Sequence, residues 1–465
     1  MFIKTKILQK ISVILSCITF SLYAEPLGFE SNSNPQPNPT SDLQLESILR
    51  ADSNNGVTLK ELLERANNNY SLQGQNLLNQ QAQKEYLISK LAFIPTLDAK
   101  YNFNHIGAGG RISDPTSYHA QNAQLALSWT FDWSTYEATR EKNATMQKTN
   151  YDTKYAKQSV YLQVVQQYYT YFSNESTLIT LQHKLQQIQS DVDRVQKLYD
   201  QGLRTIADLE SLKSQASSTK YQIDNATLNL TQSKLLLEYL TNSKIEGIRR
   251  ANIADPTYVL EDRSDIKSLE YQIKALKYQN AQLHYYPSFT LQDTYTYNMQ
   301  IPNFAQDMIN NAIANPGGGF SSGGFLANYA YNHNSFALNF TYQLFAKIGL
   351  SVQKQSFTLA TLANEKNLAY KKEEQKKDEE LYRKAIEVAK NQIISAKASL
   401  ISANLSYDNM KKRYDANLVT FTEYLTALST KYDAESTFIQ ALNNYEMQKA
   451  NYIFYSGQEI DKYVK

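Results

Sequence analysis

The chain carries one twelve-residue pattern twice: Tyr199-Asp-Gln-Gly-Leu-Arg-Thr-Ile-Ala-Asp-Leu-Glu210 and Tyr414-Asp-Ala-Asn-Leu-Val-Thr-Phe-Thr-Glu-Tyr-Leu425. Each copy follows a long stretch of helical character, and each stretch follows two short segments that alternate between apolar and polar residues. Self-similarity at a long period decides the architecture before any single residue does. The sequence therefore predicts an internal duplication, with a first repeat over 57–246 and a second over 247–465.

Both copies carry the local signals of a tight turn between two helices. Gly202 suits the left-handed conformation that ends a helix, and Asn417 is the next-best residue type for that position. A Thr-x-x-acid motif follows each of them, and such motifs cap the free amides at the start of a new helix. We expect two helical hairpins, with tips near 199–208 and 414–423.

Four segments have the period-two alternation of strands: 96–105, 124–133, 289–297 and 336–344. Nine or ten residues is the length of a tilted strand that spans a bilayer. A soluble hairpin with one buried face shows the same alternation, but the aromatic residues on the apolar face favour lipid. Asp293 falls on the apolar face of the third segment and makes it less regular.

The helical stretches carry a heptad seam, with apolar residues spaced by alternating threes and fours. If residues 134–200 were helical throughout, they would span roughly 100 Å. No compact globular domain needs such a helix. The seam residues before and after the first turn are Leu181, Leu185, Ile188, Val192, Val195 and Tyr199, then Leu209, Leu212, Ala216, Thr219, Ile223, Ala226 and Leu230.

Residues 1–24 are typical of a signal peptide, with a basic start, an apolar stretch from Ile11 to Tyr23 and a cleavage position after Ala24. The Asn- and Pro-rich residues 25–56 are expected to form a mobile or surface-laid extension. The single cysteine, Cys17, lies inside the signal. Ordinary cleavage and lipidation of Cys17 both stay open, and no other thiol is present for disulfides, metal binding or catalysis.

Composition favours an exported membrane protein over an enzyme or a nucleic-acid binder. The formal charge is +2, and removal of three signal-peptide lysines makes it −1, so nucleic acid is not an expected partner. The 35 tyrosines suit the aromatic girdles of a membrane β-barrel. The five histidines are scattered, and no nucleophile or phosphate-binding motif occurs in the required context, so we expect no enzyme, cofactor or metal site.

The duplicated turn resembles the Tyr-x-x-Gly-x-x-Thr-x-x-Asp motif of the TolC-like outer-membrane efflux proteins, over about 57–455. Arg263-Ser-Asp265 resembles the family's Arg-Pro-Asp, which precedes a helix that here ends at Pro287. The resemblance implies an α+β membrane protein and a homotrimer, in which four strands per chain build a 12-stranded β-barrel continued by a long coiled-coil-like α-helical barrel. Elementary physics agrees, because four strands cannot close a barrel and an open edge in lipid is costly.

The resemblance also implies a function and partners. The chain would be the outer-membrane exit duct of a tripartite efflux or type I secretion system, passively conducting substrates from an inner-membrane pump of the RND or ABC type. A periplasmic adaptor, or membrane fusion protein, would connect the two. The duct would lie in the cell outer membrane, in contact with its lipid, with the helical part in the periplasm. The substrate cannot be named from the sequence.

The family's periplasmic entrance maps onto the two turns. A ring of aspartates matches Glu423, which keeps the charge, and Thr426, which loses it. A tyrosine–aspartate latch matches Tyr414 and Asp208, whereas an arginine of the family is replaced by Val419. The residues expected at the entrance and its gate are Tyr199, Gly202, Arg204 (a substitute for the missing arginine), Asp208, Tyr414, Asn417, Thr420, Glu423 and Thr426. Helix capping and seam packing are compatible alternative roles for several of them.

Three other interpretations remain. A coiled-coil structural or adhesive surface protein explains the heptads but not the paired strands. A periplasmic adaptor has a helical hairpin, but one flanked by small Gly- and Val-rich β domains that are missing here. A solute porin would need many more strands in one chain.

Overall fold

A computed structural model describes residues 56–106, 118–300, 332–342, 349–416 and 418–464, together with the single residues Asn310 and Ala314. The described residues all belong to one compact unit, Ile48–Lys465. The predicted signal peptide, the predicted extension up to residue 55 and Asn417 lie outside them. Within these ranges, no helix combines the length and the apolarity needed to cross a lipid bilayer.

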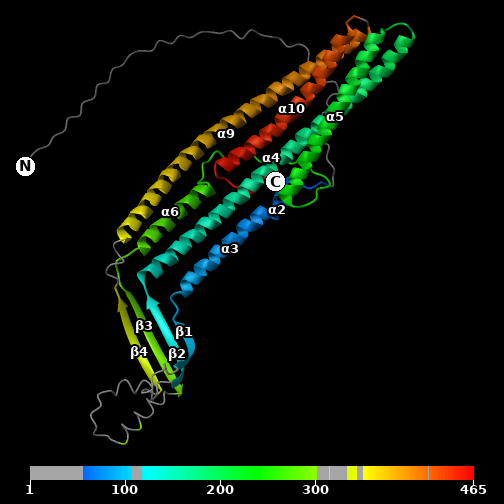
Figure 1. Cartoon of the computed structure of the whole chain (residues 1–465). Coiled ribbons are helices and arrows are strands. Elements are labelled where there is room, and N and C mark those ends of the chain that lie inside the picture. The colour runs from blue at the N-terminus through cyan, green and yellow to red at the C-terminus, as the bar shows by residue number, and fades with distance from the viewer. Residues whose placement is uncertain are drawn as a thin grey trace, which may run out of the picture. The chain divides into compact units, whose positions relative to one another are not determined.

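Four strands form one antiparallel sheet in the order β1-β2-β3-β4 (Figure 1). They are β1 (Thr96–Ile106), β2 (Tyr118–Phe131), β3 (Ser288–Gln300) and β4 (His333–Thr341). They overlap the four predicted ranges with shifted ends. β2 stops at Phe131, short of the predicted 133, because the Asp132 side chain accepts the Ser134 backbone N–H at 2.8 Å and begins a helix.

The register gives the sheet one apolar and one polar face. Phe131 pairs with Phe289, which pairs with Phe340, so aromatic residues form a row near one end of the strands. Asp293 lies on the apolar face between its partners Leu127 and Phe336, and its buried Oδ1 has no hydrogen-bond partner. This is the irregularity that the alternation in the third segment predicted.

The first repeat holds four helices: α2 (Leu59–Ala66), α3 (Tyr70–Leu91), α4 (Trp133–Asp200) and α5 (Ile206–Thr241). Residues 67–69 separate α2 from α3. The interruption has a local cause, because the Asn69 side chain accepts the Ser71 N–H at 2.8 Å and caps α3.

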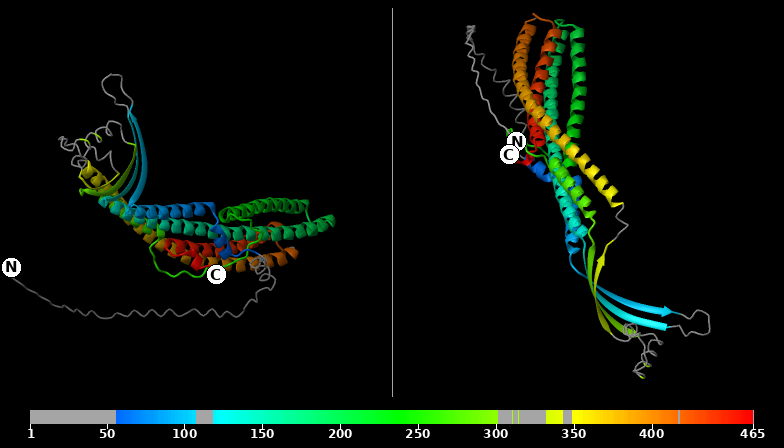
Figure 2. Two further views of the ribbon diagram at one scale, coloured as in Figure 1. Left: turned by 90° about the horizontal axis from the view of Figure 1, so that it is seen from below. Right: turned by 90° about the vertical axis from the view of Figure 1, so that its left-hand side faces the viewer.

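The second repeat holds α6 (Ser264–Gln282), α9 (Leu350–Asp415) and α10 (Phe421–Tyr455), followed by a short 3₁₀ turn at Ile460–Lys462. α10 packs along both α9 and α4, and α4 packs along α5. The order across the two hairpins is therefore α5-α4-α10-α9. Figure 2 shows the hairpins side by side, with both turns at the end away from the strands.

The larger apolar core lies where α2, α4 and α10 meet the connection at 245–253. Tyr168 and Tyr169 of α4 are fully buried there, and their hydroxyls donate to the carbonyls of Arg249 and Ala251. Close by, the buried Arg263 of the Arg-Ser-Asp motif binds Asp265 through hydrogen bonds of 2.7 and 2.8 Å. These contacts fix the connection between the repeats and align the two hairpins.

Candidate functional site: the paired hairpin turns

The first turn is built as the sequence suggests. Gly202 has a φ of 73°, and its N–H donates to the Tyr199 carbonyl at 2.8 Å, which closes the end of α4. Thr205 then caps α5, because its hydroxyl accepts the Asp208 N–H at 3.2 Å. The Asp208 side chain makes no hydrogen bond or ion pair within the described ranges, so this carboxylate stays available. Tyr199 is exposed beside the turn.

The second turn uses its acid differently. Thr420 and Glu423 form a complete capping box, in which the Glu423 carboxylate accepts the Thr420 N–H at 2.7 Å and its hydroxyl at 2.8 Å. These hydrogen bonds lower the pKa of Glu423. The Thr426 hydroxyl is also engaged, donating to the Thr422 carbonyl at 2.9 Å. The first turn of α10 therefore offers a carboxylate that is already bound, and no second acid.

Tyr414 is held as an aromatic core residue and not by its hydroxyl. Its ring is almost completely buried and stacks on the ring of Tyr424, with the centroids 4.9 Å apart. The guanidinium of Arg204, from the first turn, lies 4.5 Å from the Tyr414 ring centroid. The Tyr414 hydroxyl is buried and has no hydrogen-bond partner among the described residues. The structure thus places Tyr414 near Arg204 and Asp208 but does not form the Tyr414–Asp208 hydrogen bond that the resemblance implies.

A polar connection between the hairpins lies beside Tyr414, at residues that the sequence interpretation missed. The Tyr424 hydroxyl of α10 donates to the buried Asp191 carboxylate of α4 at 2.6 Å. Burial, together with Asp191, raises the pKa of Tyr424. Arg194 binds Asp191 at 3.0 Å and also forms an ion pair with Asp415 at the end of α9. One aspartate–arginine unit of the first repeat thereby contacts both helices of the second hairpin, α10 and α9.

A sequence signal for this connection exists in α4. Ile188, Asp191 and Val195 are buried together, and their spacing of three and four is that of a seam. The sequence interpretation placed the seam at Val192 because valine is apolar. Val192 is only partly buried, and the carboxylate takes the interior position. A charged residue at heptad spacing between two apolar seam positions is the feature that identifies the contact.

The surroundings of the polar connection are apolar and aromatic. A cluster of ten buried residues joins both hairpins: Ile188, Val195, Leu209, Leu212, Tyr407, Tyr414, Phe421, Tyr424, Leu428 and Tyr432. Val419, which stands where the family has an arginine, packs against this cluster. The residue type therefore fits its environment, and the cation near Tyr414 comes from Arg204 and Arg194.

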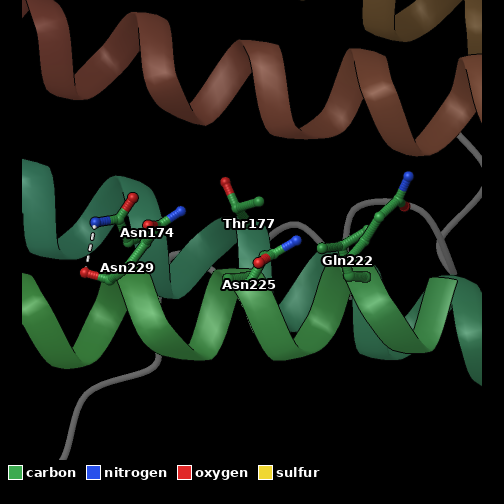
Figure 3. Close-up of a pocket in the computed structure, with 7 residues that line it drawn as sticks. Asn174, Thr177, Gln222, Asn225 and Asn229 are labelled. Carbon is green, nitrogen blue, oxygen red and sulfur yellow. Dashed lines mark hydrogen bonds between the residues drawn. The ribbon is translucent and has the colours of Figure 1, made fainter. Parts of the chain in front are cut away.

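Farther from the turns, the α4–α5 seam becomes polar. A cavity of about 170 Å³ opens between the two helices and is lined by amide and hydroxyl side chains (Figure 3). The Asn174 side chain donates to the Asn229 carbonyl at 3.2 Å across it. In the part of the chain that the structure describes, no group of three or more His, Cys, Asp or Glu residues is arranged to hold a metal ion.

Comparison with known proteins agrees with this architecture. Residues 62–243 match the model of a family described as outer membrane efflux protein. No curated protein sequence gives a significant match. Among solved structures, the outer membrane protein VceC of Vibrio cholerae has a TM-score of 0.73 and 15% sequence identity, covering 86% of this chain and 96% of that chain.

Two further solved structures share the fold. The CmeC outer membrane channel of Campylobacter jejuni has a TM-score of 0.71 and 17% identity, covering 97% of this chain and 93% of that one. The MtrE outer membrane channel of Neisseria gonorrhoeae, in its open state, has a TM-score of 0.69 and 17% identity, with coverages of 86% and 89%. Residues 62–243 thus match the model of the outer membrane efflux protein family, and the chain shares the fold of these outer membrane channels through its second repeat.

Proposed function

We propose that three copies of this chain form the outer-membrane exit duct of a tripartite efflux or type I secretion system. The duct conducts substrates passively, while an inner-membrane pump of the RND or ABC type supplies energy through a periplasmic adaptor that meets the hairpin turns. The observation that carries the proposal is the four-stranded sheet, which has an apolar face and two edges, β1 and β4, without a partner strand among the described residues. Three copies supply twelve strands and close those edges.

The helices support the same closure. α5 and α9 stand at the two ends of the hairpin order, and both carry exposed apolar side chains at helical spacing. On α5 these are Tyr221, Leu228, Leu235 and Tyr239, and on α9 they are Leu381, Val388, Ile394, Ile401 and Leu405. Such a stripe is stabilised when another apolar stripe covers it. The α5 edge of one copy meets the α9 edge of the next in the proposed trimer.

Hydrogen bonds between neighbouring helices show which residues lie at the same height along the helix axes. Asn174 reaches Asn229 of α5, the neighbouring Ser173 reaches α10, and on α10 Asn444 reaches Gln392 of α9. Leu228 of α5 and Ile394 of α9 therefore lie at about the same height. They belong to opposite edges of one chain, so they meet only between copies.

Cross-linking tests this arrangement. We expect the double variant Leu228→Cys with Ile394→Cys to form covalent dimers and trimers on oxidation in detergent. Leu228→Cys with Leu359→Cys is the matched control, because Leu359 is an exposed apolar residue of α9 far from that level. Absence of cross-links in the first pair, with a monomer by mass, would contradict the duct and favour the alternative of a coiled-coil structural or adhesive surface protein.

We also infer that the entrance is held by the connection between the hairpins, through Tyr424, Asp191, Arg194 and Asp415. The buried Tyr424–Asp191 hydrogen bond fixes α10 to α4, and Arg194 extends the contact to α9. Loss of a charge-assisted hydrogen bond in a buried site removes about 1.5–3 kcal/mol. That energy is sufficient to change the open population of a two-state entrance more than tenfold.

Single-channel conductance separates this connection from the Tyr414 hydroxyl. We expect Tyr424→Phe to raise the open probability markedly and Tyr414→Phe to leave it unchanged, because the Tyr414 hydroxyl has no partner to lose. The two variants remove the same atom from neighbouring stacked rings. A larger effect of Tyr414→Phe would assign the latch to Tyr414 and overturn the inference.

A further inference from the structure

The polar face of the sheet is almost free of charge. In register, Asp98 pairs with Ala126, which pairs with Thr294, and the next polar row begins with Lys100, which pairs with Gln124. Asp98 and Lys100 are the only acidic or basic residues, histidine aside, on this face of the described strands. In the rows from Thr96 to Asn102, the rest of the face is made of Thr, Ser, Asn, Gln and Ala, with His333 ending the Lys100 row.

Both charges are exposed and unengaged. Neither side chain forms an ion pair or a hydrogen bond within the described residues, and the two charges are not paired with each other. Many charged residues of the helices behave otherwise: Lys371, for example, binds Glu374 at 2.6 Å. Two residues along a strand are about 6.5 Å apart, so the acid and the base occupy adjacent rows of the same edge strand.

We propose that Lys100 and Asp98 are the residues that determine charge selectivity in the membrane part of the duct. This inference rests on the proposed function, in which the polar face lines the lumen and three copies place three lysines above three aspartates. Rings of charged side chains set ion selectivity in pores. Against an otherwise neutral wall, each ring acts within about 8–10 Å at physiological salt, and it discriminates between anionic and cationic solutes that leave the cell.

Reversal potentials in planar bilayers under a salt gradient test the proposal. We expect Lys100→Gln to shift the cation-to-anion permeability ratio upward by about twofold or more, and Asp98→Asn to shift it downward, with both shifts shrinking at high salt. Lys60→Gln is the control, because Lys60 is an exposed lysine of α2, far along the chain from the sheet. Permeability ratios that stay unchanged in both variants while the channel conducts normally would overturn the proposal.

Thiol labelling tests independently which face of β1 lines the lumen. Cys17 is the only cysteine of the chain, so Lys100→Cys and Tyr101→Cys each add one defined thiol. We expect a charged, membrane-impermeant thiol reagent to modify residue 100 quickly and residue 101 slowly, since Tyr101 lies on the apolar face. The reverse order would overturn the inference. A protein that inserts without any conductance would instead refute the proposed duct, and with it the lumen on which the inference depends.

Discussion

The two hairpin turns share a pattern, but they place their acids in different roles. In the first turn Asp208 is one methylene too short to reach back to the helix start, so Thr205 caps α5 alone and the carboxylate stays unbound. In the second turn Glu423 reaches the Thr420 N–H and completes the box. One side-chain carbon therefore decides whether the carboxylate of the turn is available to another partner or is used to hold its own helix.

The contact between the turns is likewise unequal. The first repeat contributes most of the charge, through Asp191, Arg194 and Arg204. The second contributes the aromatic rings of Tyr414 and Tyr424, with Asp415 as its only acid in the contact. Buried rings beside buried charges are stable only when each charge has a partner. The duplicated chain has thus diverged into two complementary surfaces, and this complementarity joins the hairpins.

Among single substitutions near the turns, removal of the Asp191 carboxylate should lower the free energy of unfolding most. Asp191→Ala leaves the buried Tyr424 hydroxyl unpartnered and takes one of two acids from Arg194. We expect a loss of about 3 kcal/mol in the free energy of unfolding, measured by denaturant titration. Asp193→Ala is the control, since Asp193 is an exposed acid on the same helix. Equal losses in the two variants would show that the buried connection has no special role.

The two caps should differ in strength. Thr420→Ala removes a hydroxyl that accepts the Glu423 N–H and donates to the Glu423 carboxylate, and it is expected to cost about 1.5 kcal/mol. Thr205→Ala removes a single bond and should cost about 1 kcal/mol or less. Thermal unfolding followed by circular dichroism compares them in one experiment. The reverse ranking would mean that the Glu423 contact adds nothing.

The backbone of the first turn gives a smaller effect. Gly202 has a positive φ and open space around its Cα, so any cost of substitution comes from the backbone conformation alone. We expect Gly202→Ala to cost about 1 kcal/mol and Gly202→Asn clearly less, because Asn tolerates the left-handed region. If Asn were no better than Ala in unfolding titrations, the equivalence of Gly202 with Asn417 would lose its basis.

Acid should weaken the second turn slightly. The pKa of Glu423 is lowered by its hydrogen bonds, so its contribution to stability is present above the ordinary value of 4.5 and is lost as the pH falls through the lower folded-state pKa. We expect the free energy of unfolding of Glu423→Gln to fall slightly less with decreasing pH below 4.5 than that of the parent protein. A variant profile that is steeper than the parent profile would contradict the assigned sign.

Patterns of repetition and periodicity were enough to predict the strands, the long helices and the turns. Gly202, Thr205 and Thr420 act locally, and local signals can be interpreted without a fold. Asp191 was missed because its role depends on Tyr424, which is 233 residues away, and no local rule joins them. The role of Tyr414 could not be predicted for the same reason, since the sequence shows a hydroxyl but not whether that hydroxyl has a partner.

Single-particle imaging of the detergent-extracted protein tests the central claim most directly. The account predicts a threefold particle, with a β-barrel at one end and a helical tube whose length is set by α4, about 100 Å at 1.5 Å per residue over its 68 residues. A monomer, or a thin rod without a barrel, would contradict it.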